Sequence, residues 1–115
     1  MSEDCLFCKI VRGEIPSGMV YEDERVYAFR DIDPQAPVHV LVVPREHIGR
    51  VSEVGEMNEE LVGHLVWVAA EVARWEGVEE DGYRLVINCG EHGGQAVEHR
   101  HVHLRGGRAM GWPPG

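Results

Sequence analysis

The sequence is poor in positive charge. It carries 11 lysines and arginines against 20 aspartates and glutamates, so its formal net charge is −9. Binding to a nucleic-acid backbone or to an anionic membrane surface needs clustered basic side chains, and the sequence contains no run of them. We therefore expect neither nucleic acid nor a membrane among the partners of this protein.

Long apolar runs and cysteines are scarce as well. The longest stretch without a charged residue spans residues 34–44, which is shorter than the ~20 residues that cross a bilayer. There are only three cysteines, and this odd number does not suit a disulfide framework. Because the sequence also shows no signal peptide, we expect a cytoplasmic protein.

What the sequence does contain suits one globular domain. With 115 residues and 43% hydrophobic content, the chain can bury roughly two-thirds of the surface that its unfolded form exposes. A core of that size needs no disulfides. We therefore expect a single domain over residues 1–115.

Hydrophobic periodicity predicts several short strands and one long helix. Asn58 suits a helix N-cap, apolar residues recur at helical spacing through residues 61–72, and Gly77 ends the pattern. A shorter helical stretch is expected between residues 8 and 16. Alternating or β-branched composition predicts strands at residues 19–21, 26–29, 38–43, 83–88 and 98–105. An antiparallel sheet backed by a helix, an α+β fold, fits this order.

Three histidines alternate along the last predicted strand. Side chains on a strand point to its two faces in turn, so His99, His101 and His103 are expected on one side, about 6.6 Å apart. Imidazoles grouped in this way suit a nucleophile or a metal site. A solvated strand face is the structural alternative, and the spacing alone leaves these interpretations open.

The two N-terminal cysteines, Cys5 and Cys8, have the Cys-x-x-Cys spacing of half a tetrahedral zinc site. Two further ligands have to come from elsewhere in the chain. A pair of reduced cysteines without a metal is the alternative.

Several segments together resemble one protein family. The segment His99-Arg100-His101-Val102-His103-Leu104 resembles the histidine-triad motif, in which three histidines alternate with hydrophobic residues. Further segments match in family order, namely Gly93-Gly94-Gln95, the Trp-Pro-Pro-Gly ending and residues 7–10, 14–16, 31–39 and 43–48. The chain is therefore similar to the histidine triad (HIT) family, in its Hint-like branch, over residues 5–115. This resemblance implies one HIT-like α+β domain with a five-stranded antiparallel sheet, one long helix and a short N-terminal helix.

The resemblance also implies a nucleotide hydrolase. In the family the middle histidine, here His101, attacks the α-phosphorus of a purine nucleoside phosphoramidate of the AMP-amine type. Water then releases the nucleoside monophosphate from the nucleotidyl-histidine. His103 and Gln95 would stabilise charge on the phosphoryl oxygens, so the implied catalytic residues are His101, His103 and Gln95.

A binding site for a purine nucleotide is part of the same resemblance. Asp31 would bind the ribose hydroxyls, and Asn88 and the backbone amides of Gly94 and Val97 would lie at the phosphate. His39 would support the triad by hydrogen bonding. The base pocket would be lined by apolar residues, whose alternative role is core packing: Phe7, Ile10, Ile15, Phe29, Ile32 and Leu41.

A structural metal and a dimer are implied as well. Zinc-bearing members complete the cysteine pair with two histidines, which makes a closed Zn²⁺ site. Its four ligands would be Cys5, Cys8, His47 and His99. Members also form two-fold dimers that join two sheets and pack the long helices together. Trp112 would then reach toward the site of the partner.

Three positions depart from the family pattern. Arg100 and Arg105 stand where the motif prefers hydrophobic residues. Ala96 stands where Hint-like proteins usually carry a serine that helps to protonate the leaving amine. Two alternatives to a phosphoramidase therefore stay open. One is a dinucleoside polyphosphate hydrolase, which the Trp-Pro-Pro-Gly ending disfavours, and the other is a zinc-stabilised nucleotide-binding or interaction module without turnover.

Overall fold

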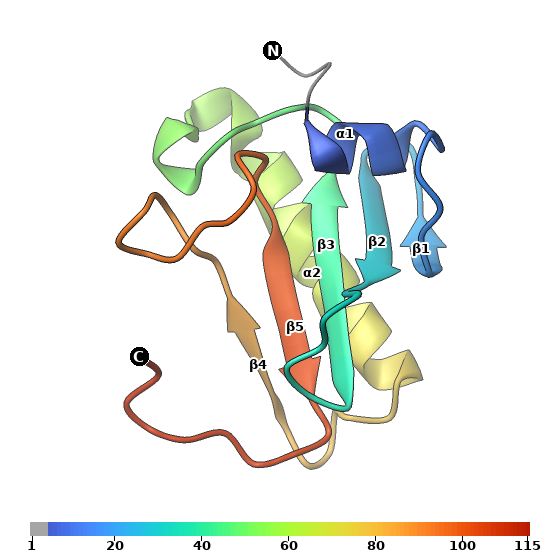
Figure 1. Ribbon diagram of the computed structural model, residues 1–115, viewed down its shortest axis with the longest axis vertical. Helices are drawn as coiled ribbons and strands as arrows, with labels where there is room; N and C mark the ends of the chain where they lie inside the picture. The colour runs from blue at the N-terminus through green and yellow to red at the C-terminus, as the bar shows by residue number, and fades with distance from the viewer. Residues whose placement is uncertain (1–4) are drawn as a thin grey trace.

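The structure, a computed structural model, describes residues 5–115 as an antiparallel sheet with a helix on either face (Figure 1). Its five strands have the order β1-β2-β3-β5-β4, and every neighbouring pair is antiparallel. The strands are β1 (Met19–Glu22), β2 (Val26–Arg30), β3 (Val38–Pro44), β4 (Tyr83–Val86) and β5 (Val102–Gly106). The expected α+β fold is confirmed. Residues 1–4 of the predicted domain lie outside the described residues.

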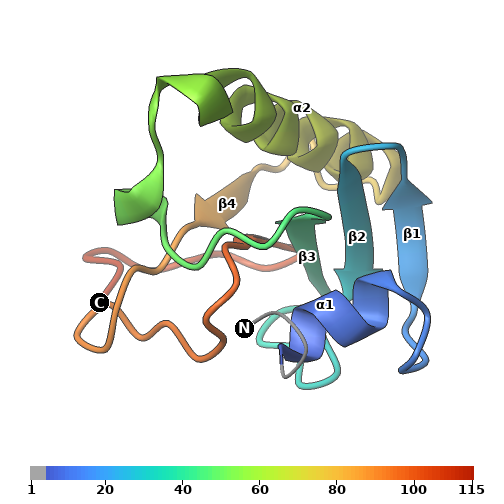
Figure 2. The same cartoon turned by 90° about the horizontal axis from the view of Figure 1, so that it is seen from above.

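The long helix α2 (Glu59–Trp75) covers one face of the sheet, and the short helix α1 (Leu6–Val11) lies on the other (Figure 2). Two 3₁₀ turns, η2 (Val51–Glu53) and η3 (Glu56–Asn58), precede α2. Gly77 follows the end of α2 with a φ of 78°, a conformation that favours glycine.

One detail of the predicted helix start is different. Asn58 is the N-cap of α2, but its side chain accepts a hydrogen bond from the Gly55 N–H and does not cap the helix. In the described part of the chain, no helix is both long enough and apolar enough to span a membrane.

Alternation along the strands sends two sets of side chains to the two faces of the sheet. On β3, Val40 and Val42 are fully buried in the main core with Leu65 of α2. Leu41, between them, belongs to a second cluster that includes Phe7 of α1. The histidines described below lie on this second face.

Two predicted strands are shorter than expected. The strand predicted for residues 98–105 begins only at Val102. The reason is that the Arg100 N–H donates to the Ile48 carbonyl (2.5 Å) and the His99 N–H to the Val97 carbonyl (2.8 Å), so neither joins a strand ladder. The strand predicted for residues 83–88 ends at Val86. The prediction that three histidines alternate along one strand is therefore wrong, because only His103 lies on β5.

Arg100, one of the departures from the family pattern, is buried. The residue is 1% exposed, and one terminal nitrogen donates to the Arg50 carbonyl. Its Nε and Nη1 atoms have no hydrogen-bond partner among residues 5–115. Burial lowers the pKa of this guanidinium. A polar group thus occupies an interior position at a cost in free energy.

Candidate functional site

Two histidines, His101 and His103, lie side by side at the start of β5. Their ring centroids are 4.9 Å apart, and the residues are only 4% and 9% exposed. His103 is paired in register with Leu41 of β3, so its ring projects from the face of the sheet opposite α2. Phe7 of α1 contacts His101 edge-on, with ring centroids 5.0 Å apart. The sheet and α1 together hold the two imidazoles in place.

A backbone carbonyl fixes the tautomer of His101. Its Nδ1 atom lies 2.8 Å from the carbonyl oxygen of His99. A carbonyl only accepts hydrogen bonds, so Nδ1 carries the proton and Nε2 keeps its lone pair. Burial lowers the pKa of His101, which keeps the ring neutral at pH 7. His101 therefore presents the unprotonated nitrogen that a nucleophile needs.

A second set of hydrogen bonds fixes the tautomer of His103. The Gln35 N–H donates to Nδ1 of His39 (3.0 Å), so the proton of His39 is on Nε2. That Nε2 lies 2.9 Å from Nδ1 of His103 and donates to it, which leaves the proton of His103 on its own Nε2. Burial, helped by the positive charge of nearby Arg105, lowers the pKa of His103 to about 4. The hydrogen bond expected between His39 and the triad is confirmed, and His103 is a neutral donor.

The carboxylate of Asp31 lies beside His39 and His103, but the three residues do not form a metal site. The ligand atoms of Asp31, His39 and His103 lie within 4.8 Å of one another, and Oδ2 of Asp31 is 3.4 Å from Nε2 of His39. Metal coordination requires a lone pair on the nitrogen. Because the Gln35 N–H occupies Nδ1 of His39, Nε2 carries a proton and has no lone pair to offer. The trio is a hydrogen-bonded relay.

Two cavities meet at the histidine pair. The first, which we name the apolar pocket, has a volume of about 350 Å³ and includes Asp31 and Val97 at its margin. Its wall contains every residue predicted to contact the purine base, namely Phe7, Ile10, Ile15, Phe29, Ile32 and Leu41. Ile32 is 97% exposed and forms the rim. A cavity of this kind suits a flat and largely apolar ligand group.

The second cavity, which we name the outer pocket, is polar and has a volume of about 240 Å³. It shares Asp31, Ala96, His101 and His103 with the apolar pocket. The rest of its lining is Asp33, Gln35, His39, Asn88, Gly94 and Arg105. Asn88 and Gly94, predicted to lie at the phosphate, are therefore brought to the histidine pair.

Two predicted site residues line neither pocket. The side-chain amide of Gln95 donates to the carbonyls of Gly49 (2.6 Å) and Val97 (3.0 Å), and its Oε1 accepts the Gly90 N–H (2.9 Å). These bonds hold the loop between β4 and β5 and turn the amide away from the histidine pair. Trp112 is 84% exposed near the C-terminus.

The four residues of the predicted zinc site come together, with their ligand atoms within 4.8 Å of one another. Nδ1 of His99 lies 3.2 Å from Sγ of Cys5 and 3.4 Å from Sγ of Cys8. Nδ1 of His47 is also 3.4 Å from Sγ of Cys8. Nε2 of His99 donates to the Pro44 carbonyl (2.8 Å), so its Nδ1 lone pair faces the cysteines.

This donor set fits one zinc ion. In a tetrahedral zinc site with ordinary bond lengths, a sulfur and a nitrogen ligand lie about 3.6 Å apart. The observed sulfur–nitrogen distances of 3.2–3.4 Å are close to that value. Burial and the neighbouring Cys5 raise the pKa of the Cys8 thiol to about 11, so a thiolate at this position requires a nearby cation.

Sequence reasoning missed two parts of the site. Arg105 lines the outer pocket, with its Nε 3.3 Å from Nε2 of His39. Arg105 follows His103 by two residues on β5, so strand alternation places both side chains on the same face. This spacing could have identified Arg105 from the sequence. Gln35 sets the tautomer of His39 through its backbone N–H, for which the sequence contains no signal.

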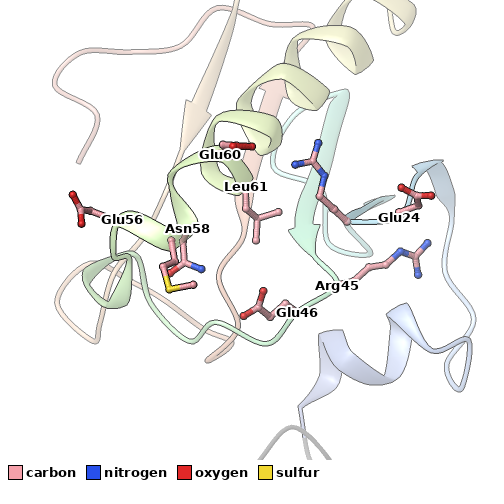
Figure 3. Close-up of a pocket in the computed structure, with 9 residues that line it drawn as sticks. Glu24, Arg45, Glu46, Glu56, Asn58, Glu60 and Leu61 are labelled. Atoms are coloured by element: carbon pink, nitrogen blue, oxygen red, sulfur yellow. The ribbon is translucent and has the colours of Figure 1, made fainter.

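A further cavity lies away from the histidine pair, between the start of α2 and the segment after β3 (Figure 3). Its volume is about 510 Å³, and four glutamates line it beside Arg25 and Arg45. Excess negative charge disfavours a phosphate ligand. None of the predicted site residues lines this cavity.

Comparison with known proteins places these observations in a family. The HIT domain family model matches residues 12–110. The chain is 51% identical over 111 residues to the purine nucleoside phosphoramidase of Escherichia coli K12, which covers 96% of this chain and 93% of that protein. It is 54% identical over 112 residues to a 14 kDa zinc-binding protein of Zea mays, covering 96% and 87% of the two chains. The crystal structure of a HIT family hydrolase from Legionella pneumophila Philadelphia 1 has a TM-score of 0.96 and 51% identity, and covers 97% of this chain and 100% of that one.

Proposed function

The chain belongs to the HIT domain family, and from that premise we propose that it hydrolyses purine nucleoside phosphoramidates, of the AMP-amine type, at the P–N bond. The observation that carries the proposal is the histidine pair beside the apolar pocket. His101 offers a lone pair and His103 a proton, and both rings are neutral. The relative from Escherichia coli is named for this class of activity.

His101 is the proposed nucleophile. Its Nε2 attacks the α-phosphorus, so a bond from phosphorus to the imidazole forms while the bond to the amine breaks. The amine nitrogen takes a proton from solvent water and departs as the neutral amine. Water then attacks the same phosphorus, which frees His101 and yields the nucleoside monophosphate. The His99 carbonyl accepts a hydrogen bond from Nδ1–H of His101 and so stabilises the positive charge that the ring gains.

His103 is the proposed donor to the phosphoryl oxygens. Its proton is on Nε2 because His39 donates to Nδ1, and a neutral donor is already oriented when charge develops on the oxygens. Asn88 and the backbone amides of Gly94 and Val97 are proposed as further donors. Gln95 contributes as a positioning residue, since its amide holds the loop that carries those groups.

The nucleoside is proposed to occupy the apolar pocket. Phe7 and Phe29 stand at 75° to each other with centroids 5.5 Å apart, and they supply aromatic surface for a purine. Asp31 lies where the two pockets meet. Its carboxylate, held by the Asp33 N–H at 2.9 Å, is proposed to bind the ribose hydroxyls.

A structural Zn²⁺ held by Cys5, Cys8, His47 and His99 is part of the proposal. The relative from Zea mays is named as a zinc-binding protein. With four protein ligands the ion supplies structural support and leaves no open position for substrate. None of the three cysteines forms a disulfide, which supports the cytoplasmic location that we propose.

We also propose a two-fold dimer. Val66 and Trp67 of α2 are 43% and 52% exposed, and β4 is an edge strand of the sheet. Burying an exposed apolar helix face and pairing an open strand edge both favour association. Sedimentation of the purified protein tests this, and a monomer at micromolar concentration would contradict it.

The experiment that tests the function is amine release from an AMP–amine phosphoramidate. We expect the wild-type protein to release amine and AMP in equal amounts. His101→Ala should lower kcat by at least about 10³-fold while AMP still binds, as measured by calorimetry. Retained turnover in His101→Ala would contradict the assigned nucleophile.

The same assay distinguishes a phosphoramidase from the two alternative functions, a nucleotide-binding module and a dinucleoside polyphosphate hydrolase. AMP binding by the wild type without amine release would point to a nucleotide-binding module. Faster cleavage of a dinucleoside polyphosphate than of the phosphoramidate would point to a polyphosphate hydrolase. Ala96 offers no hydroxyl to the leaving group, and Ala96→Ser tests whether that absence limits the phosphoramidase rate.

A further inference from the structure

The outer pocket is a cavity that the leaving group can occupy, if the proposed function holds. The two cavities share the histidine pair, and the apolar pocket takes the nucleoside. The amine leaving group, on the far side of the scissile P–N bond, then faces the polar lining of the outer pocket. Its recognition depends on the charged residues there, which are Asp31, Asp33 and Arg105.

Arg105 is an arginine without an anionic partner. No carboxylate among residues 5–115 forms an ion pair with it, in contrast to Arg30, which pairs with Glu76 (2.7 Å), and Arg50, which pairs with Glu98 (3.0 Å). Some other arginines, such as Arg84, also lack an ion pair, but among the described residues Arg105 is the arginine that lines the outer pocket. Its Nε lies 3.3 Å from Nε2 of His39. That nitrogen carries a proton, because the Gln35 N–H occupies Nδ1, so it cannot accept from Arg105.

Neither of the two aspartates of the outer pocket forms an ion pair with the Arg105 guanidinium. Asp31 accepts the Asp33 N–H with Oδ1 (2.9 Å), and its Oδ2 faces His39 at 3.4 Å. Asp33 is exposed to solvent, where water screens its charge. A half-buried guanidinium with free terminal nitrogens can bind a carboxylate or phosphate group in a bidentate manner.

We propose that Arg105 selects leaving groups that carry an anionic group, a carboxylate or a phosphate, a short distance beyond the scissile P–N bond. The guanidinium contacts that anion in the outer pocket while the nucleoside lies in the apolar pocket. Arg105 is thus a specificity-determining residue of the leaving-group side. The substrate class becomes AMP joined to an acidic amine.

Three matched phosphoramidates test this proposal. AMP is joined through nitrogen to glycine, to aminomethylphosphonate and to glycinamide, which present a carboxylate, a phosphonate and a neutral amide. We expect at least one anionic compound to exceed glycinamide in kcat/KM by about 10- to 100-fold, the range for one charge-assisted hydrogen bond. The ranking of the two anions distinguishes a carboxylate source from a phosphate source.

The ratio of kcat/KM between the anionic and the neutral compound is the readout, because it cancels any general loss of activity. Arg105→Leu should bring the ratio close to one, and Arg105→Lys should keep part of it. Arg84→Leu is the matched control. Arg84 is paired in register with Arg105, but its guanidinium donates to the Gly111 carbonyl (2.7 Å), so the ratio should stay at the wild-type value.

Binding to His101→Ala separates this proposal from the proposed function. The dissociation constants of the same compounds are measured in that variant with and without Arg105→Leu. A preference for the anion that Arg105→Leu removes supports the role of Arg105, even if the wild type cleaves none of the compounds. Equal affinities for anionic and neutral compounds, or a preference that survives Arg105→Leu, overturn it.

Discussion

At the scale of single residues, the chemistry of the site depends on which imidazole nitrogen carries a proton. A backbone group decides this for His99 and His101, whereas the imidazole of His39 decides it for His103. The His99 carbonyl places the proton of His101 on Nδ1, and the Pro44 carbonyl places that of His99 on Nε2. The same residue type thus presents its lone pair on Nε2 at His101, the proposed nucleophile, and on Nδ1 at His99, a proposed zinc ligand.

The acid limb of the pH–rate profile tests the state of His101. Burial lowers the pKa of His101 below its usual 6.5, so the unprotonated nucleophile persists into mildly acidic solution. We expect the acid-side midpoint of kcat/KM for an AMP–amine substrate to lie below pH 6.5, the ordinary pKa of an imidazole. Zinc content is measured at each pH as a control. A midpoint at pH 6.5 or higher would contradict the buried, neutral ring.

Replacing Arg100 measures how much the burial of an unpaired guanidinium lowers the stability of the fold. Two of its nitrogens lack partners within the described chain, and its one hydrogen bond goes to the Arg50 carbonyl. Arg100→Met keeps the volume and removes the buried charge, so we expect the free energy of unfolding to rise by about 1 kcal/mol. Urea denaturation measures the change. A clear loss of stability would mean that the bond to Arg50 outweighs the burial of charge.

At the scale of elements, the pattern of the sequence predicts the strands and α2 but not where the last strand begins. Arg105 and His103 follow strand alternation, and their faces could be predicted. Residues 98–101 have the composition of a strand, yet the Arg100 N–H bonds to Ile48 and the His99 N–H to Val97. The contact between Arg100 and Ile48 joins segments that are distant in sequence, so it has no local signature. The position of His99 therefore came from the family resemblance and not from periodicity.

Asp23 joins the turn between β1 and β2 to α2. Its carboxylate accepts hydrogen bonds from the Val26 N–H (2.8 Å), the Tyr21 hydroxyl (2.8 Å) and Nε2 of His64 (2.6 Å). Burial opposes ionisation, but these bonds prevail and hold the pKa of Asp23 well below its usual value. The structure thus gives His64, expected on the helix surface, a partner across the fold.

Because the pKa of Asp23 is lowered in the folded protein, the free energy of unfolding depends on pH in the acid range. The contribution of Asp23 is complete above the unfolded pKa of about 3.9 and is lost as the pH falls toward the folded pKa. We expect Asp23→Asn to lower the free energy of unfolding at pH 7 by about 1–2 kcal/mol, and the deficit to shrink below about pH 4. Glu14→Gln, at an exposed pair with Arg12, is the control and should change little. A deficit that is independent of pH would show that the charge of Asp23 is not involved.

The cysteine–histidine cluster joins three elements, namely α1, the segment after β3 and the residues before β5. Cys8→Ser should abolish zinc binding and lower the free energy of unfolding by roughly 2–5 kcal/mol. Cys89→Ser is the matched control, because Cys89 lies outside the cluster, and it should retain one zinc per chain. Metal analysis and thermal unfolding measure both effects. Equal zinc content in Cys8→Ser and the wild type would rule out the cluster as the site.

At the scale of the whole molecule, the sheet separates the main hydrophobic core from the candidate functional site. Its α2 face holds the main core, and its other face holds the histidine pair, both pockets and the cysteine–histidine cluster. Family resemblance predicted most of these positions. The role predicted for Trp112, which is exposed in this chain, requires the proposed dimer. The side chain of Gln95 hydrogen-bonds the backbone of the loop between β4 and β5. Neither could be placed from one sequence.

The central claim, that His101 forms a bond to phosphorus, is tested most directly by trapping the intermediate. The wild-type protein is mixed with excess AMP–amine phosphoramidate, quenched within one turnover and measured by mass spectrometry. We expect a mass increase of one AMP less one water, located on the peptide that contains His101 and absent from His101→Ala. An adduct on another residue, or amine release with no adduct at any time during the turnover, would contradict the claim.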